Sequence, residues 1–206
     1  MLINALNFKC LHHIFVSAHR TGYTNRILLN FEEVFVMANQ RNQRMQATIL
    51  LAYENLLSDK PFRKITVQDI SDAALVHRST FYKHFQDQYD LLEALFEQKR
   101  QQSKLTIDQI FTHPFETLNS FGNARFQETL RHQFNDDAFR DAFLNYLIHL
   151  CKDTVDDDQR LVRFLAVGRI KGLTLWITVG NAPYNIFTDT ATLDNIFSNP
   201  LNTVNY

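Results

Sequence analysis

Apolar residues along most of this chain recur every three or four positions, which is the period of an amphipathic α-helix. Only 5 Gly and 4 Pro stand among the 206 residues, so few breakers are available to separate short strands. The first regular run predicts a helix from Arg41 to about Ser58, shortly before Pro61. Its inner face carries Met45, Ile49, Tyr53 and Leu56. The pattern predicts an all-α fold.

A short helix, a turn and a second short helix are predicted between residues 66 and 85. Thr66 followed by Asp69 is typical of a capping box and predicts a helix over 67–74. The next helix, 78–85, places Phe81 and Phe85 one turn apart on its inner face. Its outer face then presents Arg78, Ser79, Tyr82 and Lys83. This arrangement is typical of a helix-turn-helix.

The outer face of the second short helix has the chemistry of a DNA reader. The guanidinium of Arg78 can donate two hydrogen bonds to guanine O6 and N7. Phosphates can be held by Tyr82, Lys83 and His84. An ordinary solvated surface is the alternative interpretation of the same helix pair.

The formal net charge of −1 conceals an asymmetry. Residues 39–104 contain 10 Lys or Arg and 8 Asp or Glu, a net +2, whereas residues 105–206 contain 8 and 12, a net −4. Within 60–84 there are five basic residues and two acidic ones. The excess positive charge therefore accompanies the predicted DNA reader, as contact with phosphates requires.

Further helices are predicted toward the C-terminus. A helix over 88–104 directs apolar residues toward the first three helices, namely Leu91, Leu92, Leu95 and Phe96. Later helices are expected over 106–113, 117–134, 137–153, 158–180 and 190–198. The breaks between them fall at Pro114, at Asn135-Asp136 and at the acidic run 156–158, which we interpret as a helix N-terminus.

No constellation for catalysis, cofactor binding or metal binding is found. The sequence has no Gly-rich phosphate loop, no G-x-S-x-G elbow and no H-E-x-x-H helix. The run 156–158 lacks the EF-hand spacing. His149 and Cys151 stand two positions apart on one predicted helix and so point in different directions. We expect neither enzyme activity, nor a cofactor, nor a metal.

Cysteine usage and hydropathy predict a cytoplasmic protein. Cys10 and Cys151 are too few and too far apart for a disulfide framework, which favours a reducing compartment. The most apolar stretch, 161–180, is interrupted by Arg163, Arg169 and Lys171. We therefore expect no membrane-spanning helix.

Residues 1–38 have neither a clean helical period nor a complete signal peptide, because two histidines, His12 and His13, interrupt the apolar run. We expect a disordered or loosely attached leader. An alternative explanation is that translation begins at Met37, since Phe31-Glu32-Glu33-Val34 can be encoded by a purine-rich string that resembles a bacterial ribosome-binding site. The expected divisions are the leader 1–38, a DNA-binding domain 39–86 and a helical body 87–206.

The segment ITVQDISDAALVHRSTFYKHFQDQYDLL, from Ile65 to Leu92, resembles the TetR/AcrR family of bacterial one-component regulators. That family's signature runs roughly T-V-x-D-I-A-x-x-A-G-V-S-x-x-T-F-Y-x-H-F-x-S-K-x-x-L-L, and the spacing matches without a gap. The resemblance implies a three-helix DNA-binding head, a connecting helix and an all-helical body that dimerises and binds a small ligand.

Carried over by position, the resemblance implies base contacts from Gln68 and Arg78 and contacts to bases or phosphates from Thr80 and Lys83. It implies phosphate contacts from Thr66, Tyr82 and His84. The predicted DNA-binding set is Thr66, Gln68, His77, Arg78, Ser79, Thr80, Tyr82, Lys83 and His84.

Three positions depart from the family pattern. Leu75 stands where the family has Gly, which predicts either another turn geometry or a left-handed residue with ~1 kcal/mol or more of strain. His77 replaces a Ser cap. Gln88 replaces a Lys and removes one expected phosphate contact. Asp87 and Asp90 still suit the start of the following helix.

The segment RIKGLTLW, residues 169–176, also resembles the family's penultimate helix. Apolar residues cover more than one face of 161–180, so this helix needs a second surface, which a partner subunit would supply. Two glycines four positions apart would let another helix approach closely; helix flexibility is the alternative role for them. The predicted dimer interface comprises Leu161, Leu165, Gly168, Gly172, Leu175 and Val179. A two-fold dimer matches a palindromic operator.

Aromatic residues are concentrated in the body, where residues 105–206 contain 10 Phe. The predicted lining of a ligand pocket comprises Phe121, Phe126, Phe143, Tyr146 and Trp176. Core packing is the alternative role for these side chains.

The leading hypothesis is a homodimeric repressor that binds a palindromic operator in double-stranded DNA and is released by a small-molecule effector. One alternative is a regulator that acts mainly through a protein partner, a coactivator or corepressor, with weak DNA binding of its own. Activation instead of repression is the other.

Overall fold

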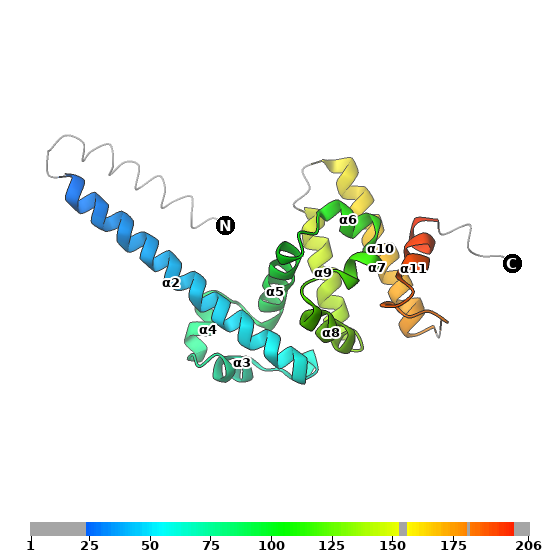
Figure 1. Cartoon of the computed structure of the whole chain (residues 1–206), viewed down its shortest axis with the longest axis horizontal. Helices are drawn as coiled ribbons and strands as arrows, with labels where there is room; N and C mark the ends of the chain where they lie inside the picture. Colours follow the sequence, from blue (N-terminus) through cyan, green and yellow to red (C-terminus); the bar gives the residue numbers. More distant parts are fainter. Residues whose placement is uncertain (1–23, 153–155, 181, 200–206) are drawn as a thin grey trace. The chain divides into compact units, whose positions relative to one another are not determined.

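A computed structural model describes residues 24–152, 156–180 and 182–199, with side chains from residue 36 onward. Throughout these ranges the regular structure is helical and no strand occurs, which confirms the all-α prediction (Figure 1). The helices of the first part are α2 (Thr24–Asp59), the 3-10 helix η1 (Phe62–Lys64), α3 (Val67–Ala73), α4 (Arg78–His84) and α5 (Gln88–Gln102). Those of the second part are α6 (Ile107–Thr112), α7 (Pro114–Asn119), α8 (Ala124–Gln133), α9 (Asp137–Lys152), α10 (Asp157–Thr178) and α11 (Thr190–Ser198).

The first helix is longer than the sequence pattern predicts. It begins at Thr24 and not near Arg41. Residues 24–40 are therefore helical although their apolar residues show no clear helical period. Neither Gly nor Pro stands between Thr24 and Pro61, and an established helix propagates readily through such a stretch. The chain divides into two compact units, residues 1–47 and 48–206, and the rest of this description concerns the second. Residues 1–23 of the predicted leader lie outside the described residues, and the proposed start at Met37 stays a prediction.

The head consists of the end of α2 with η1, α3 and α4, packed around a small apolar core. Ile49, Tyr53 and Leu57 of α2 are fully buried, as are Ile70 of α3 and Phe81 of α4. The predicted capping box begins α3: the Thr66 hydroxyl accepts from the Asp69 N–H, and the Asp69 carboxylate accepts from the Thr66 N–H at 2.8 Å. These two bonds satisfy N–H groups that a helix start leaves without partners.

The body follows the predicted order, with two corrections. The helix expected over 117–134 is interrupted, and its parts belong to α7 and α8. Gly122, between them, has a φ of +80°, which L-residues rarely adopt. The break predicted at Pro114 falls just before it, between α6 and α7, and the next helix begins at Pro114 and not at Thr117, because the missing N–H of proline costs nothing at the first position of a helix. The last helix, Thr190–Ser198, has the predicted bounds.

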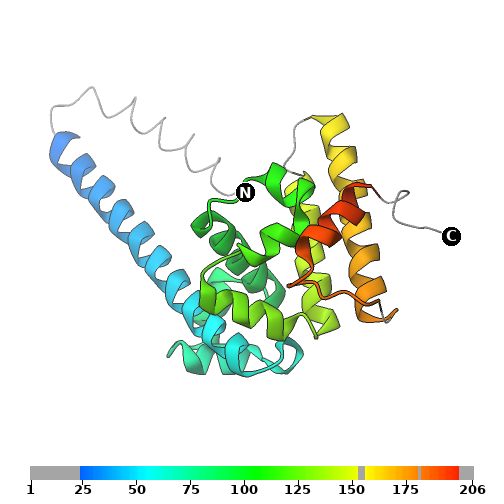
Figure 2. The ribbon, with the colours of Figure 1, turned by 45° about the vertical axis from the view of Figure 1, so that its right-hand side comes forward.

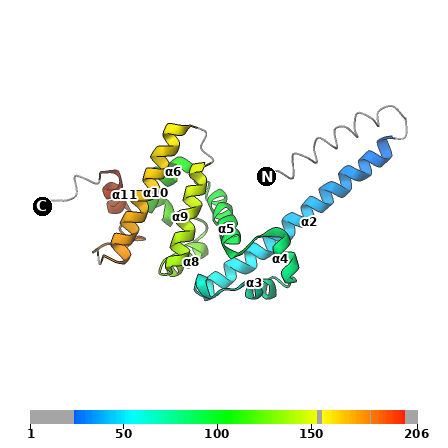
Figure 3. The ribbon, with the colours of Figure 1, turned by 180° about the vertical axis from the view of Figure 1, so that it is seen from behind.

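Helix α9 lies at the centre of the body. It packs against α5 on one side and α10 on the other, and α7 packs against α11. Figures 2 and 3 show α9 and α10 running side by side. The ring of Phe96, on α5, meets those of Phe139 and Phe143, on α9, edge to face at 5.5 and 5.2 Å between centroids. The aromatic residues of the body therefore form much of its core.

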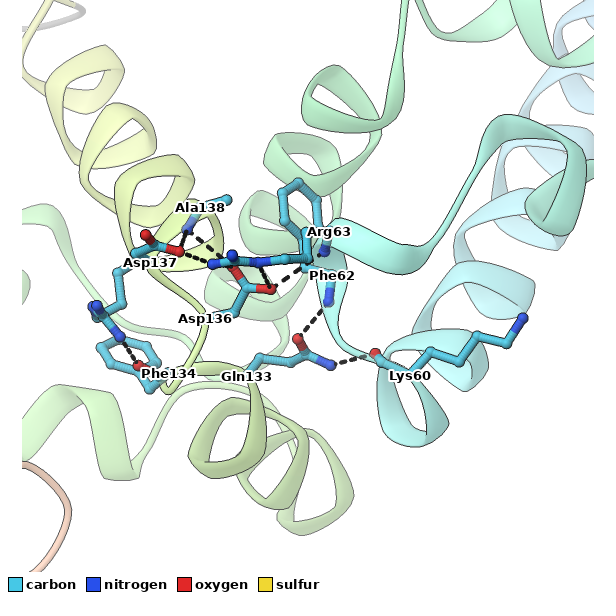
Figure 4. A network of polar contacts seen from close by, with 9 residues as sticks. Lys60, Phe62, Arg63, Gln133, Phe134, Asp136, Asp137 and Ala138 are labelled. Carbon is cyan, nitrogen blue, oxygen red and sulfur yellow. Dashed lines mark hydrogen bonds and ion pairs between the residues drawn. The ribbon is translucent and has the colours of Figure 1, made fainter.

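Two buried polar contacts hold the head on the body. Lys99 of α5 donates to both carboxylate oxygens of Glu54 on α2, at 2.7 and 2.8 Å, with only 3% of the lysine side chain exposed. The second contact is made by Gln133, at the end of α8 (Figure 4). Its Oε1 accepts from the backbone N–H of Phe62 at 2.9 Å, and its Nε2 donates to the carbonyl oxygens of Leu57 and Lys60 at 2.6 and 2.7 Å.

An arginine completes this junction. The Arg63 guanidinium donates to both oxygens of Asp136, at 3.1 Å each, and also pairs with Asp137 (Figure 4). Asp136 is buried, and it accepts from the Ala138 N–H at the start of α9 as well. We call Gln133, Asp136 and Arg63 the latch. It joins the turn before α3 to the loop between α8 and α9.

No helix among the described residues is both long and apolar enough to cross a membrane.

Candidate nucleic-acid interface

Helix α4 is divided into a buried face and a solvent face. Phe81 is fully buried and Phe85, its C-cap, is 6% exposed, whereas Tyr82 is 50% exposed. The rings of Phe81 and Phe85 lie 6.0 Å apart, so they anchor the helix to the core of the head. The remaining side chains of α4 are therefore presented outward, as the sequence predicts.

Side-chain contacts organise the outer faces of α4 and α3. The Arg78 guanidinium donates to the Tyr82 hydroxyl at 3.2 Å and lies 5.8 Å from the centre of its ring. On the neighbouring helix α3, the Gln68 amide donates to Asp72 at 2.7 Å. Both contacts link residues one helical turn apart and limit the positions that these two side chains adopt.

His77 serves as the N-cap of α4. Its Nδ1 accepts from the Ser79 N–H at 3.2 Å and shares a hydrogen bond with the Ser79 hydroxyl at 2.9 Å. The histidine thus satisfies one helix N–H in place of the serine typical of this position. His77 and Ser79 are exposed, and their hydrogen bonds to each other also cap the start of α4.

Thr66 is also engaged in local structure. Its hydroxyl donates to Asp69 at 2.6 Å within the capping box. The bonds from Thr66, with a further one from Lys60, lower the pKa of Asp69 to about 2. Asp69 therefore stays ionised, and its negative charge stabilises the N-terminus of α3.

All nine predicted DNA-binding residues are accessible at the surface of the head. Seven are exposed, and Thr80 and His84 are half-buried. The exposed ones are Thr66, Gln68, His77, Arg78, Ser79, Tyr82 and Lys83.

The turn between α3 and α4 adopts the left-handed conformation. Leu75 has a φ of +55°, where the family pattern has Gly, and its side chain is 93% exposed. Its N–H still donates to the carbonyl oxygen of Asp72 at 3.1 Å. The departure is therefore accommodated by strain at one residue and leaves the geometry of the turn intact.

Helix α10 presents a continuous apolar surface opposite the face that it buries. Ala166, Val167, Ile170 and Thr174 are buried against the body. On the opposite side lie the six residues predicted for a dimer interface, all exposed: Leu161, Leu165, Gly168, Gly172, Leu175 and Val179. We call these six the α10 face. A Cβ added at either glycine would meet nothing within 4 Å in this subunit.

Four of the five residues predicted for a ligand pocket pack against one another, with ring centroids 5.8–6.4 Å apart along the series Phe126, Phe121, Phe143 and Tyr146, whereas Trp176 lies apart from them. Phe121 and Phe143 line an enclosed cavity of about 30 Å³. Phe126 and Tyr146 are buried but do not line it. Trp176 is 44% exposed on α10, where its ring lies 5.6 Å from that of Tyr184.

The latch was not anticipated from the sequence. Gln133 stood inside a predicted helix and Asp136 in a predicted break, and neither belongs to a recognisable motif. Their partners in the head are mostly backbone atoms about 70 residues earlier, which leave no signal in side-chain types.

Comparison with known proteins matches the head. Residues 49–95 fit the family described as bacterial regulatory proteins, tetR family. A stretch of 52 residues is 38% identical to the HTH-type dhaKLM operon transcriptional activator DhaS of Lactococcus lactis subsp. lactis (strain IL1403). That match spans 25% of this chain and 28% of the relative.

Two solved structures are similar over a longer part of the chain. One is NalD, the secondary repressor of the MexAB-OprM multidrug efflux pump in Pseudomonas aeruginosa, with 21% identity, a TM-score of 0.43, and coverage of 76% of this chain and 94% of NalD. The other is the TetR family repressor AlkX from Dietzia sp. strain DQ12-45-1b, with 17% identity, a TM-score of 0.42, and coverage of 77% and 96%.

Proposed function

Because this chain belongs through its head to the TetR family of bacterial regulatory proteins, we propose that it is a sequence-specific DNA-binding repressor that acts in the cytoplasm as a homodimer. The observation that carries the proposal is the solvent face of α4, where Arg78 donates to the Tyr82 hydroxyl and Lys83 is exposed, together with the exposed Gln68 on α3. A capped helix of this length enters a major groove, and an arginine there reads guanine.

A dimer is supported by the α10 face. Glycine inside a helix costs about 1 kcal/mol relative to alanine, and nothing within the subunit requires a glycine at 168 or 172. A second helix packed against these positions would explain the two glycines, since small residues let two helices approach closely. Two copies related by a two-fold axis then present two α4 helices to a palindromic operator.

Control by an effector is supported by the latch. Gln133 and Asp136 hold the turn that precedes α3, and Phe134, between them, lines the enclosed cavity. A ligand that occupies the body and moves this loop shifts the population of head positions away from the spacing that the operator needs. Repression follows from occupancy of the operator alone and requires no further contact.

The proposal is tested by a mobility-shift assay on the DNA upstream of the protein's own gene. At moderate salt we expect retardation of that DNA at a concentration at least 100-fold lower than for a random duplex of the same length, since specific sites are typically favoured by ~10³ or more. Equal retardation of both duplexes would refute specific recognition.

A second candidate is a regulator that acts through a protein partner. Two observations favour it: the cavity of about 30 Å³ is small for an effector site, and the relative DhaS is named an activator. This candidate predicts that Arg78→Ala leaves regulation of a reporter gene unchanged. Loss of regulation in that variant, with its fold intact by circular dichroism, would eliminate the candidate.

A further inference from the structure

The cavity has one cationic side chain in a wall that is mostly apolar. Arg140 of α9 lines it together with the two threonines Thr117 and Thr174, and every other lining residue is apolar. No Asp or Glu contributes to the lining. A polar group placed in such a wall sets the orientation and the chemical class of the ligand.

A surface groove adjoins this cavity. It has a volume of about 350 Å³ and is lined by the end of α8, the end of α10 and residues 184–188. It too contains one cation, Arg131, and no carboxylate. Its volume lies within the range of small-molecule sites, which begins at about 300 Å³.

Only two side chains, Phe134 and Ile186, belong to both linings. On the groove side, the ring of Phe134 meets that of Phe187 edge to face at 5.4 Å. On the cavity side, it meets that of Phe143 at 5.8 Å. A rotation of Phe134 would therefore join the groove to the cavity.

Arginines stand on both sides of this aromatic partition. The guanidinium of Arg140 donates to the carbonyl oxygen of Phe134, and that of Arg131 lies 5.8 Å from the centre of the Phe187 ring. Neither arginine forms an ion pair with another residue of the described part of the chain. Arg140 is half-buried and Arg131 is exposed. A guanidinium that lacks a carboxylate partner is suited to binding an anion, in a bidentate manner where geometry allows.

We propose that the groove and cavity together bind an apolar molecule that carries one carboxylate, with Phe134 as the gate between them. The apolar body packs in the groove, whose volume of about 350 Å³ accommodates it, and the carboxylate lies at Phe134, between Arg131 on the groove side and Arg140 on the cavity side. This inference rests on the proposed function, because it names the class of effector that the regulator would sense.

The gate also lies beside the latch. Gln133 and Asp136 are one and two residues from Phe134, and both bind the segment 60–63 of the head. Displacement of Phe134 by a ligand therefore pulls on the residues that position α3 and α4. Sub-ångström shifts at such a junction are amplified when a packed interface has two alternative arrangements.

The test uses the full-length protein without DNA and three ligands of equal chain length: octanoate, octan-1-ol and octylamine. Trp176 is the sole tryptophan and contacts Tyr184, which lines the groove, so its fluorescence reports occupancy. We expect octanoate to bind at least about tenfold more tightly than the alcohol, the size of one charged hydrogen bond, and the amine to bind more weakly still. Calorimetry provides an independent readout. Equal binding of octanoate and octan-1-ol, or no binding of octanoate, would overturn the proposal.

Three arginine variants locate the carboxylate. Arg140→Met and Arg131→Met keep an unbranched apolar stem and remove the guanidinium with its charge, and each is expected to weaken octanoate binding about tenfold while leaving octan-1-ol binding unchanged. Arg125→Met, at an exposed position on α8, is the matched control and should bind octanoate like the wild type. Because Arg131 is exposed, its variant is expected to fold even if Arg140→Met does not. Undiminished octanoate binding in Arg131→Met would refute the assignment.

These measurements separate this inference from the proposed function. Specific retardation of the upstream DNA without octanoate binding would sustain the regulator and reject the carboxylate site. Octanoate binding without specific retardation would sustain the site and reject the DNA-binding function.

Discussion

The side chain of Gln133, on α8, forms hydrogen bonds with backbone groups around Phe62 in the head. Its amide accepts from the Phe62 N–H and donates to the carbonyl oxygens of Leu57 and Lys60, and its side chain is almost completely buried. One side chain of α8 thus takes part in the folding of the head. The side chain of Gln133 thereby supplies partners to backbone groups that the body buries, as buried backbone groups require.

Replacement of Gln133 by Leu should destabilise the protein strongly. The apolar side chain has a similar size but leaves three backbone groups of the head unpaired, and we expect a loss on the order of 3 kcal/mol in the free energy of unfolding. Urea unfolding followed by circular dichroism measures it. The matched control is Gln127→Leu on the same helix, because Gln127 makes no side-chain hydrogen bond with another described residue. Equal stability of the two variants would contradict the role assigned to Gln133.

The turn between α3 and α4 offers a stabilising change. Leu75 has a φ of +55°, and glycine adopts this conformation without the clash of a Cβ atom. We expect Leu75→Gly to raise the free energy of unfolding by about 0.5–1 kcal/mol. The control Leu75→Ala removes the exposed apolar atoms and keeps the Cβ, so it should bring no gain. A gain in Ala equal to that in Gly would attribute the effect to exposure and not to strain.

Features that depend on residues close together in the sequence are the ones that could be predicted. The Thr66–Asp69 cap and the last helix depend on neighbouring residues, and the structure has them as predicted; at Leu75 it has the left-handed conformation, one of the two alternatives expected there. The split between α7 and α8 was missed because one glycine at positive φ outweighed a favourable helical period.

Contacts between residues far apart in the sequence could not be predicted, for a different reason. Gln133 binds backbone atoms, which are the same for every residue type, so no pattern marks its partners. The aromatic residues predicted for a pocket were chosen by type, and aromatic type indicates burial but not which void a ring borders. Trp176 illustrates this, since it lies on the exposed side of α10.

Two side chains of α4 should affect operator binding differently. Arg78→Ala is expected to lower affinity for the operator by about 1–3 kcal/mol and to relax preference at one base pair, because the lost contact reads a base. Lys83→Ala should weaken operator and random DNA alike and reduce the salt dependence by about one unit of slope. Fluorescence anisotropy at several salt concentrations checks both. A uniform loss in Arg78→Ala would place Arg78 on a phosphate instead.

The hydrogen bonds around Glu97 on α5, first that from Arg100, should make stability depend on pH. Hydrogen bonds from Arg100, Tyr146 and Gln101 lower the pKa of Glu97 from 4.5 to about 2. A carboxyl whose pKa is depressed by folding stabilises the protein above its unfolded pKa, and this contribution disappears as the pH falls from about 4.5 toward 2. Because the Glu97 side chain is about a third exposed, solvent screening reduces the effect to ~1 kcal/mol.

The variant Glu97→Gln tests that prediction. It keeps the shape and one acceptor oxygen but has no charge to lose. At pH 7 we expect it to be less stable than the wild type by about 1 kcal/mol, and the difference should vanish as the pH approaches 2. A difference that stays constant from pH 7 to pH 2.5 would mean that the carboxylate charge contributes nothing.

The α10 face can be tested at Gly172, where the needs of the subunit and of a dimer oppose each other. Within the subunit a larger side chain meets nothing within 4 Å, and replacing glycine should favour the helix by up to about 1 kcal/mol. Against a second copy, the same side chain would prevent close approach. Gly172→Leu is therefore expected to be monomeric in sedimentation velocity and no less stable than the wild-type subunit. Because two linked heads bind with an avidity that one head lacks, its operator affinity should fall by about a hundredfold.

Lys171→Leu is the matched control, one position away. It adds the same side chain off the α10 face and loses only an exposed pair with Asp141 at 3.9 Å, so it should remain a dimer. If Gly172→Leu sediments as a dimer, copies of the chain associate through some other surface.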